Sequence, residues 1–203
     1  MVAEEAERHP GAVIEAFATD EHRIGLKPIL RRVWAPRGQR PIARGHHRFE
    51  WLYVTAFVSP ATGESFWYLS TGVDKELFAD TLALFAREAG AGRDRIILLV
   101  LDGAGWHTAP GLTVPEGIRL VYRSRGKPST GRFSCPSNPY TPELQPAETL
   151  WVHVDEPIVN THFDSLADLD AVVAEQCVTL GNDRNLIRGQ TGFHWWPERA
   201  IPI

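Results

Sequence analysis

The chain has 203 residues, of which 43% are hydrophobic and 23% charged, proportions that are ordinary for one folded globular domain. No stretch approaches the ~20 consecutive apolar residues of a membrane helix, and the acidic opening MVAEEAERHPG lacks the apolar segment of a signal peptide. We therefore expect a cytoplasmic protein without a membrane span. Cys135 and Cys177 lie far apart, which excludes a CxxC-type zinc site and predicts free thiols.

Charge is distributed unevenly along the chain, although the net charge is only −4. No acidic residue occurs from His22 to Phe49, and this stretch is rich in arginine and lysine. A second basic run extends from Arg119 to Arg132. Most charge runs are only solvated surface, but so long a stretch without an acid favours a face that holds a phosphate backbone.

The first half of the chain predicts a strand, a loop and a hairpin. Val13–Leu26 is rich in apolar residues, which predicts a strand, and it carries Asp20 near its middle or end. The Pro-, Gly- and Arg-rich segment that follows predicts an irregular basic loop or an open hairpin. Phe49–Val58 and Ser65–Ser70 are β-prone and are separated by a turn, which predicts an antiparallel pair.

The second half predicts helices around a buried strand. Apolar residues recur at helical spacing in Asp74–Ala89 and in Ser165–Leu180, and Thr141–Val154 begins as a Pro-rich turn and continues as a helix. Arg95–Leu101 is continuously apolar, as in a central strand buried on both faces, and Gly117–Tyr122 is a further short strand. The order indicates an α/β fold, a mixed sheet flanked by helices.

Three acids occupy positions that suit metal chemistry. Asp20 lies in an apolar strand, Asp102 directly follows the buried strand, and Glu148 lies on a helix that carries Trp151. Taken singly, each has an ordinary explanation as a turn, cap or surface residue. Together they could hold two divalent ions roughly 3.5–4 Å apart, the arrangement that serves phosphodiester cleavage.

Four blocks in order carry a resemblance to a known family: TDEHRIGLKP, RRVWAPRGQRP, ILLVLDGAGWHTAP and NPYTPELQPAETLW. They resemble the DDE superfamily endonuclease domain of mariner-like bacterial insertion-sequence transposases. The resemblance implies a ribonuclease-H-like fold with a mixed five-stranded sheet over residues 13–203, after an N-terminal extension of residues 1–12. It assigns the catalytic and metal-binding triad to Asp20, Asp102 and Glu148.

The resemblance also implies a function. Mg²⁺ or Mn²⁺, as two ions, would support cleavage of double-stranded DNA and strand transfer between transposon ends and target, in the cytoplasm at the nucleoid. Water and then a DNA 3′-hydroxyl would be the nucleophiles, without a covalent enzyme intermediate. The residues expected to hold DNA phosphates are Arg23, Arg31, Arg32, Arg37, Arg40 and Lys127.

Several neighbouring residues have two interpretations. His107 is either an accessory residue near DNA and metal or a capping and packing residue. Trp34 and Trp151 are expected to be core aromatics. Glu21 is expected to face away from Asp20, because successive strand side chains alternate. Glu143 competes with Glu148 for the third acid, although its position indicates a loop.

Two departures from the family pattern define the alternatives. No helix-turn-helix region precedes Asp20, so a separately encoded helix-turn-helix subunit and a homo-oligomer stay open as partners. The spacing of Asp102 and Glu148, 148 − 102 = 46 positions, is long for the family and reflects a basic insertion at about 123–137. A catalytically inactive DNA-binding or assembly remnant is therefore the alternative. A hydrolase with paired carboxylates is a third reading, but it leaves the basic loop unexplained.

Overall fold

The structure is a computed structural model that describes residues 1–39, 41–42, 48–122 and 145–202. Arg40, Lys127, Cys135, Glu143 and the basic insertion at about 123–137 lie outside the described residues. The expectations that concern them are therefore not addressed by the structure. Cys177 is a buried free thiol, as the sequence predicts.

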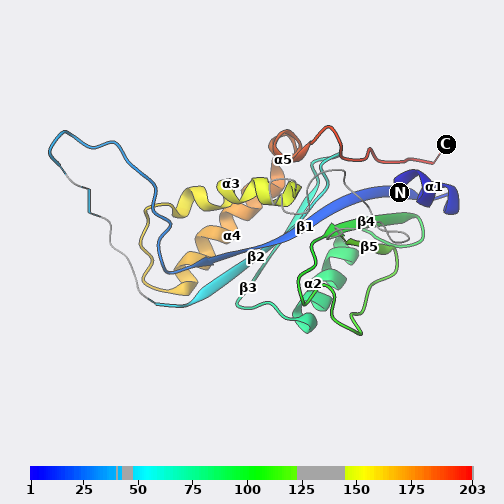
Figure 1. Ribbon diagram of the computed structural model, residues 1–203, viewed down its shortest axis with the longest axis horizontal. Helices are drawn as coiled ribbons and strands as arrows, with labels where there is room; N and C mark the ends of the chain where they lie inside the picture. Colours follow the sequence, from blue (N-terminus) through cyan, green and yellow to red (C-terminus); the bar gives the residue numbers. More distant parts are fainter. Residues whose placement is uncertain (40, 43–47, 123–144, 203) are drawn as a thin grey trace.

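A five-stranded mixed sheet forms the centre of the molecule, with strand order β3-β2-β1-β4-β5 (Figure 1). The central strand β1 pairs antiparallel with β2 and parallel with β4, and β2–β3 is the predicted hairpin. The strands are β1 (Val13–Gly25), β2 (Trp51–Val58), β3 (Ser65–Ser70), β4 (Arg95–Leu101) and β5 (Ile118–Tyr122). This architecture confirms the predicted ribonuclease-H-like fold class.

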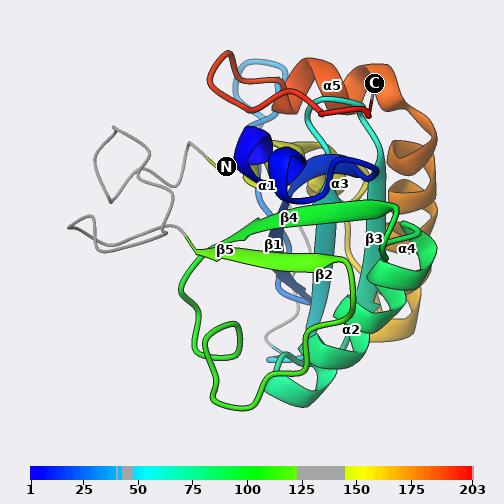
Figure 2. The ribbon, with the colours of Figure 1, turned by 90° about the vertical axis from the view of Figure 1, so that its right-hand side faces the viewer.

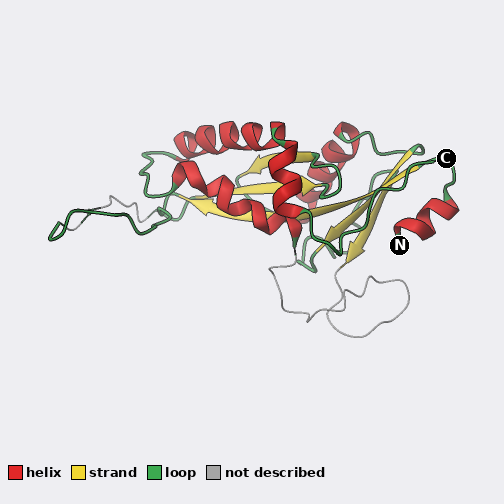
Figure 3. Ribbon diagram, turned by 90° about the horizontal axis from the view of Figure 1, so that it is seen from above, coloured by secondary structure: helices red, strands yellow, loops and turns green. Residues whose placement is uncertain are grey.

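Helices cover both faces of this sheet (Figure 3). Helix α2 lies on one face, and α3, α4 and α5 lie on the other. The α-helices are α1 (Val2–Arg8), α2 (Lys75–Glu88), α3 (Trp151–Asp155), α4 (Leu166–Asn182) and α5 (Arg184–Thr191). The 3₁₀ turns η2 (Pro146–Leu150) and η3 (Glu156–Ile158) flank α3. Asp74 and Ser165 cap α2 and α4 through their side chains, which explains where these helices begin.

Side-chain alternation along β1 supplies both cores. Ile14, Ala16 and Ala18 contribute to the core beneath η2 and α5, whereas Phe17 contributes to the core beneath α2. Strand β4 is buried along nearly its whole length, as expected of a strand covered on both faces. The position of a residue on β1 therefore decides which helical layer it meets.

The structure adds elements that the sequence analysis did not predict. Residues 1–12 include helix α1, whose Val2 joins the core, so this segment packs onto the domain. Helix α5 follows α4 directly, and the final segment forms a bridge from Ala200 to Ile14 on β1. Figure 2 shows α1 and the C-terminal segment on the same side of the sheet. In the part of the chain that the structure describes, no helix is long and apolar enough to cross a membrane.

The described part of the segment between β1 and β2 is irregular, as predicted, and projects away from the sheet (Figure 1). The prediction that Trp34 is a core aromatic is wrong, because its side chain is fully exposed. Ile42 and Phe49 are also exposed. None of these three side chains is covered by the described cores.

Candidate active site

Asp20 lies on β1, and Asp102 directly follows β4, the neighbouring parallel strand. The last paired residues of β1 and β4 are Ala18 and Val100, and each aspartate stands two positions beyond its strand's member of that pair. The carboxyl ends of parallel strands meet at one edge of a sheet, which is where ligands bind in open α/β folds. The register of the central strands therefore brings the first two acids of the predicted triad to the same end of the sheet.

The Asp20 carboxylate faces the α3 layer and is largely buried. Its Oδ2 accepts a hydrogen bond from Trp151 Nε1 at 3.0 Å, and the backbone N–H of Glu21 also donates to it. The pKa of Asp20 is raised to about 7: burial is the largest cause, the nearby charges of Glu148 and Glu21 also raise it, and the Trp151 hydrogen bond opposes the rise. In the described residues, no arginine or lysine forms an ion pair with this carboxylate.

Glu148 lies in the 3₁₀ turn η2, close enough to Asp20 for their charges to interact. Pro146 opens this turn, and the backbone N–H of Glu148 donates to the carbonyl of Gln145 at 3.0 Å. Gln145 Nε2 donates in turn to the carbonyl of Thr19 at 2.7 Å. The third acid is thus presented by a short turn that is bonded to the strand of the first acid.

Asp102 is linked to Glu21 through His107. The imidazole Nδ1 lies 2.8 Å from Asp102 Oδ1, and Nε2 lies 2.9 Å from Glu21 Oε1. Burial alone would lower the pKa of His107, but the hydrogen bonds and charges of the two carboxylates raise it to about 9. A doubly protonated ring can donate to both acids. His107 is therefore a cation buried between two carboxylates near neutral pH.

Two interpretations of neighbouring residues change in light of these contacts. Glu21 points to the α2 face, away from Asp20, as expected. Its carboxylate also forms a hydrogen bond with His107. Trp151 does pack in the core beneath α3 and α4, but its indole N–H also contacts Asp20. In the sequence, the only indication that Trp151 and Gln145 belong to the site was their spacing from Glu148: Gln145 lies three positions before it and Trp151 three positions after it.

The donor set of the site is composed of carboxylate oxygens, which suit Mg²⁺ and Mn²⁺. Across the described ranges, no three His, Cys, Asp or Glu side chains lie close enough together to hold a metal ion. The acids form two groups: Asp20 with Glu148, and Asp102 with His107 and Glu21. The first group fits a divalent cation, because a buried carboxylate facing a second carboxylate gains from an added positive charge.

The described arginines predicted to contact DNA lie on or near the projecting segment. Arg23, Arg32 and Arg37 are exposed, and Arg23 lies 4.5 Å from the ring centre of Trp51. Arg31 pairs with Glu156 and its backbone N–H donates to Asn160. Arg31 therefore anchors the base of the segment to the helical layer, which differs from a purely DNA-facing role.

The strand order, its parallel β1–β4 pair and the flanking helices define a ribonuclease-H-like α/β domain. The chain belongs to the family described as "DDE superfamily endonuclease", whose model matches residues 16–170. A relative from Sinorhizobium fredii (strain NBRC 101917 / NGR234), named "Uncharacterized protein y4pE/y4sA", is 30% identical over 128 residues. The match covers 63% of this chain and 81% of that protein.

Two solved structures of the mariner Mos1 transposase share the fold. The paired end complex with Mg has a TM-score of 0.58 at 14% identity, and the match covers 88% of this chain and 51% of that one. The paired end complex with Mn has a TM-score of 0.52 at 14% identity, with 90% and 57% covered. At this identity the likeness shows the fold alone. This chain spans little more than half of the Mos1 chains.

Proposed function

We propose that this chain is the catalytic domain of a transposase, a divalent-metal-dependent DNA endonuclease and strand transferase that acts in the cytoplasm. The observation that carries the proposal is the state of Asp20. It is a partly buried carboxylate on the central strand, a second acid lies close enough for their charges to interact, and its pKa is raised to about 7. Perturbed carboxylates of this kind concentrate at functional sites.

The residues proposed to hold the metal are Asp20, Asp102 and Glu148. Two Mg²⁺ or Mn²⁺ ions, when bound, would supply charge neutralisation at a scissile phosphate and activation of a nucleophilic oxygen. His107 holds one oxygen of Asp102, and the backbone N–H of Ala104 donates to the same oxygen. We propose that the His107 ring orients Asp102, which defines more closely the accessory role expected from the sequence.

Double-stranded DNA is the proposed partner. Arg23 is exposed near the end of β1, and Arg32 and Arg37 are exposed on the segment that projects away from the sheet. Their guanidinium groups suit phosphate contacts without base readout. The Mos1 structures are paired end complexes of that transposase. The present chain spans only about half of the Mos1 chain. We therefore also propose transposon-end recognition, a helix-turn-helix subunit and homo-oligomerisation, none of which is argued from the geometry of this domain.

Conversion of supercoiled plasmid to nicked circles in Mn²⁺ tests the proposal. The wild type is expected to nick, whereas Asp20→Asn, Asp102→Asn and Glu148→Gln should fall to the level of buffer alone. Asp80→Asn changes an exposed acid on α2 and should nick as the wild type does. Nicking that survives all three site substitutions would overturn the assignment.

The alternative is a catalytically inactive DNA-binding or assembly remnant with the same fold. Its specific support is that, within the described residues, the acids do not converge into one three-ligand group. Mobility shifts on unrelated duplexes distinguish the two functions. DNA binding without Mn²⁺-dependent nicking by the wild type would favour the remnant.

A further inference from the structure

The turn that carries Glu148 is bonded to β1 on both sides of that residue. Before Glu148, the Gln145 side chain donates to the carbonyl of Thr19 at 2.7 Å. After Glu148, the Trp151 indole donates to Asp20 Oδ2 at 3.0 Å. Both contacts join residues more than 120 positions apart, with separations of 126 and 131. They end on Asp20 and on the residue that precedes it.

We propose that Trp151 and Gln145 are positioning residues that set Asp20 and Glu148 relative to each other for metal binding. The inference rests on the proposed function and names the residues that make its site. Neither residue is assigned to touch metal or DNA. Trp151 acts through Asp20, and Gln145 acts through the backbone of β1 and of η2.

Trp151 is held in place by its own neighbours. Its ring stacks on His22, with ring centres 5.0 Å apart and planes 12° apart, and His22 Nε2 lies 2.9 Å from Asp155 Oδ1. Trp67 packs edge-on against it at 6.3 Å. Because the stack on His22 holds the indole, its N–H restricts the orientation of the Asp20 carboxylate. One lone pair of Oδ2 is then occupied, and the carboxylate keeps further lone pairs that can face a cation.

Gln145 positions the turn η2 by a hydrogen bond to the backbone of β1. Its side chain is 2% exposed, so the amide N–H that reaches the Thr19 carbonyl could not be replaced by a water without rearrangement. A carbonyl can only accept, so the amide group facing Thr19 must be the nitrogen. The same residue's carbonyl receives the N–H of Glu148. One residue thus fixes the distance from β1 to the start of η2.

The first experiment compares Trp151→Phe with Trp67→Phe, a matched control in the same aromatic cluster. Each substitution removes one indole N–H, but Trp67 donates to Ser65 Oγ and not to an acid of the site. Mn²⁺ affinity is measured by titration calorimetry. Loss of an outer hydrogen bond to a metal ligand weakens binding by about 10- to 100-fold. We expect such a loss for Trp151→Phe, and less than about 3-fold for Trp67→Phe.

The second experiment detects the hydrogen bond from Trp151 to Asp20 by NMR and does not depend on enzyme activity. The chain has 7 tryptophans, and their indole N–H resonances separate in spectra of ¹⁵N-tryptophan-labelled protein. The resonance lost in Trp151→Phe identifies that indole. It should shift in Asp20→Asn and again when Mg²⁺ is added to the wild type, whereas the Trp67 resonance should not shift. Gln145→Met, which keeps the side-chain length but lacks the amide donor, should also weaken Mn²⁺ binding.

The outcomes separate the two proposals. Wild-type protein without an Asp20-dependent Mn²⁺ site would overturn the proposed function, and this inference with it. Asp20→Asn that fails to bind Mn²⁺ while Trp151→Phe binds as tightly as the wild type would overturn this inference alone. If Trp151→Phe does not fold, wild-type spectra in which no indole N–H resonance shifts on Mg²⁺ addition overturn it equally.

Discussion

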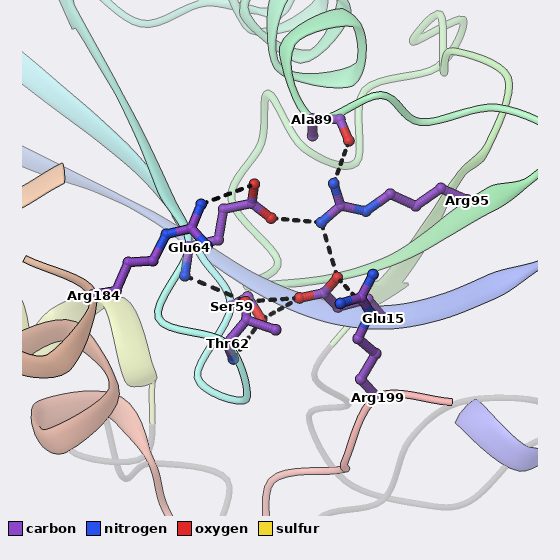
Figure 4. Close-up of polar contacts among 8 residues, drawn as sticks. All are labelled: Glu15, Ser59, Thr62, Glu64, Ala89, Arg95, Arg184 and Arg199. Atoms are coloured by element: carbon purple, nitrogen blue, oxygen red, sulfur yellow. Dashed lines mark hydrogen bonds and ion pairs between the residues drawn. The ribbon is translucent and has the colours of Figure 1, made fainter. Parts of the chain in front are cut away.

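Strand β1 carries the buried acid Glu15 near its beginning and the partly buried acid Asp20 further along, and the surroundings of these two acids are opposite. The side chain of Glu15 has 0% exposure and is surrounded by donors from several parts of the chain (Figure 4). Asp20 receives one side-chain hydrogen bond, from Trp151, and faces the charges of Glu148 and Glu21. Within the described residues, the same strand thus holds one acid that is paired with cations and one that is not.

The contacts of Glu15 account fully for its burial. Arg95 pairs with it at 2.9 Å and Arg199 at 3.4 Å, and the hydroxyls of Ser59 and Thr62 donate to it at 2.6 and 2.9 Å. Arg95 also pairs with Glu64 in the β2–β3 turn (Figure 4). A buried carboxylate with two cations and two hydroxyl donors is satisfied by the chain itself.

The contrast between Glu15 and Asp20 indicates where a cation from outside the chain would bind. Burying a charge is costly unless it is paired, so an acid that keeps its place without a cationic partner marks a site whose partner comes from outside the chain. By this criterion Glu15 stabilises the structure of the domain, and Asp20 is the acid to which we propose a chemical role.

Glu15→Gln should destabilise the protein by about 3 kcal/mol, because two arginines lose their common carboxylate. The low end of the usual range applies since Arg95 and Arg199 are 21% and 35% exposed. Urea unfolding monitored by circular dichroism gives the change. Mn²⁺ affinity should not change, and a large loss of affinity would contradict the division between the two acids.

His107→Gln should cost about 2 kcal/mol at neutral pH, the scale of hydrogen bonds to charged groups. The folded-state pKa of His107, about 9, lies above the ordinary histidine pKa of 6.5. The stabilisation is therefore fully present below about pH 6.5 and lost as the pH rises through 9. Unfolding free energies of the two proteins should converge between these pH values. A constant difference up to pH 10 would show that the bonds to Asp102 and Glu21 do not depend on the ring's charge.

Asp20→Asn should stabilise the metal-free protein by about 1 kcal/mol at pH 8, the reverse of the effect at Glu15. The pKa of Asp20 is raised from 3.8 to about 7, so the folded state binds more protons between these values, and stability falls as the pH rises through them. The substitution removes this slope. Partial solvent access keeps the gain well below the full value of the shift.

The control for Asp20→Asn is the addition of Mn²⁺. The wild type should gain thermal stability by mass action, whereas the variant should not. With saturating metal the order of stability of the two proteins should therefore reverse. A wild type that is the more stable of the two without metal would show that the chain does neutralise Asp20.

The fold was largely predictable because its signals are local. The continuous apolar run Arg95–Leu101 and the β-prone Ser65–Ser70 coincide with β4 and β3, and the caps Asp74 and Ser165 set the starts of α2 and α4. Helix α5 was not predicted, because it is short and polar on average. Its stability comes from packing against η2 and α4, which no local pattern reveals.

The site was predictable only in part. Asp20, Asp102 and Glu148 were proposed from motif order, and their roles stay predictions. The bond from Trp151 to Asp20 and the bridge of His107 to Glu21 span separations of 131 and 86 positions. Sequence alternation correctly placed Glu21 on the other face, but it carried no information on what that face contains. Contacts of this range depend on tertiary packing rather than on spacing.

The smallest expected effect concerns Arg199, which ties the C-terminal segment to the structural acid. Arg199→Met should cost about 1 kcal/mol, because the arginine is partly exposed and Arg95 still neutralises Glu15. Arg184→Met is the matched control: Arg184 lies 3.9 Å from Glu64 and is 64% exposed, so its loss should cost under about 0.5 kcal/mol. A double-mutant cycle of Arg199→Met with Glu15→Gln should show coupling, since the two substitutions remove the same contact. Strictly additive effects would mean that Arg199 does not contribute to the neutralisation of Glu15, and that Arg95 and the two hydroxyls suffice.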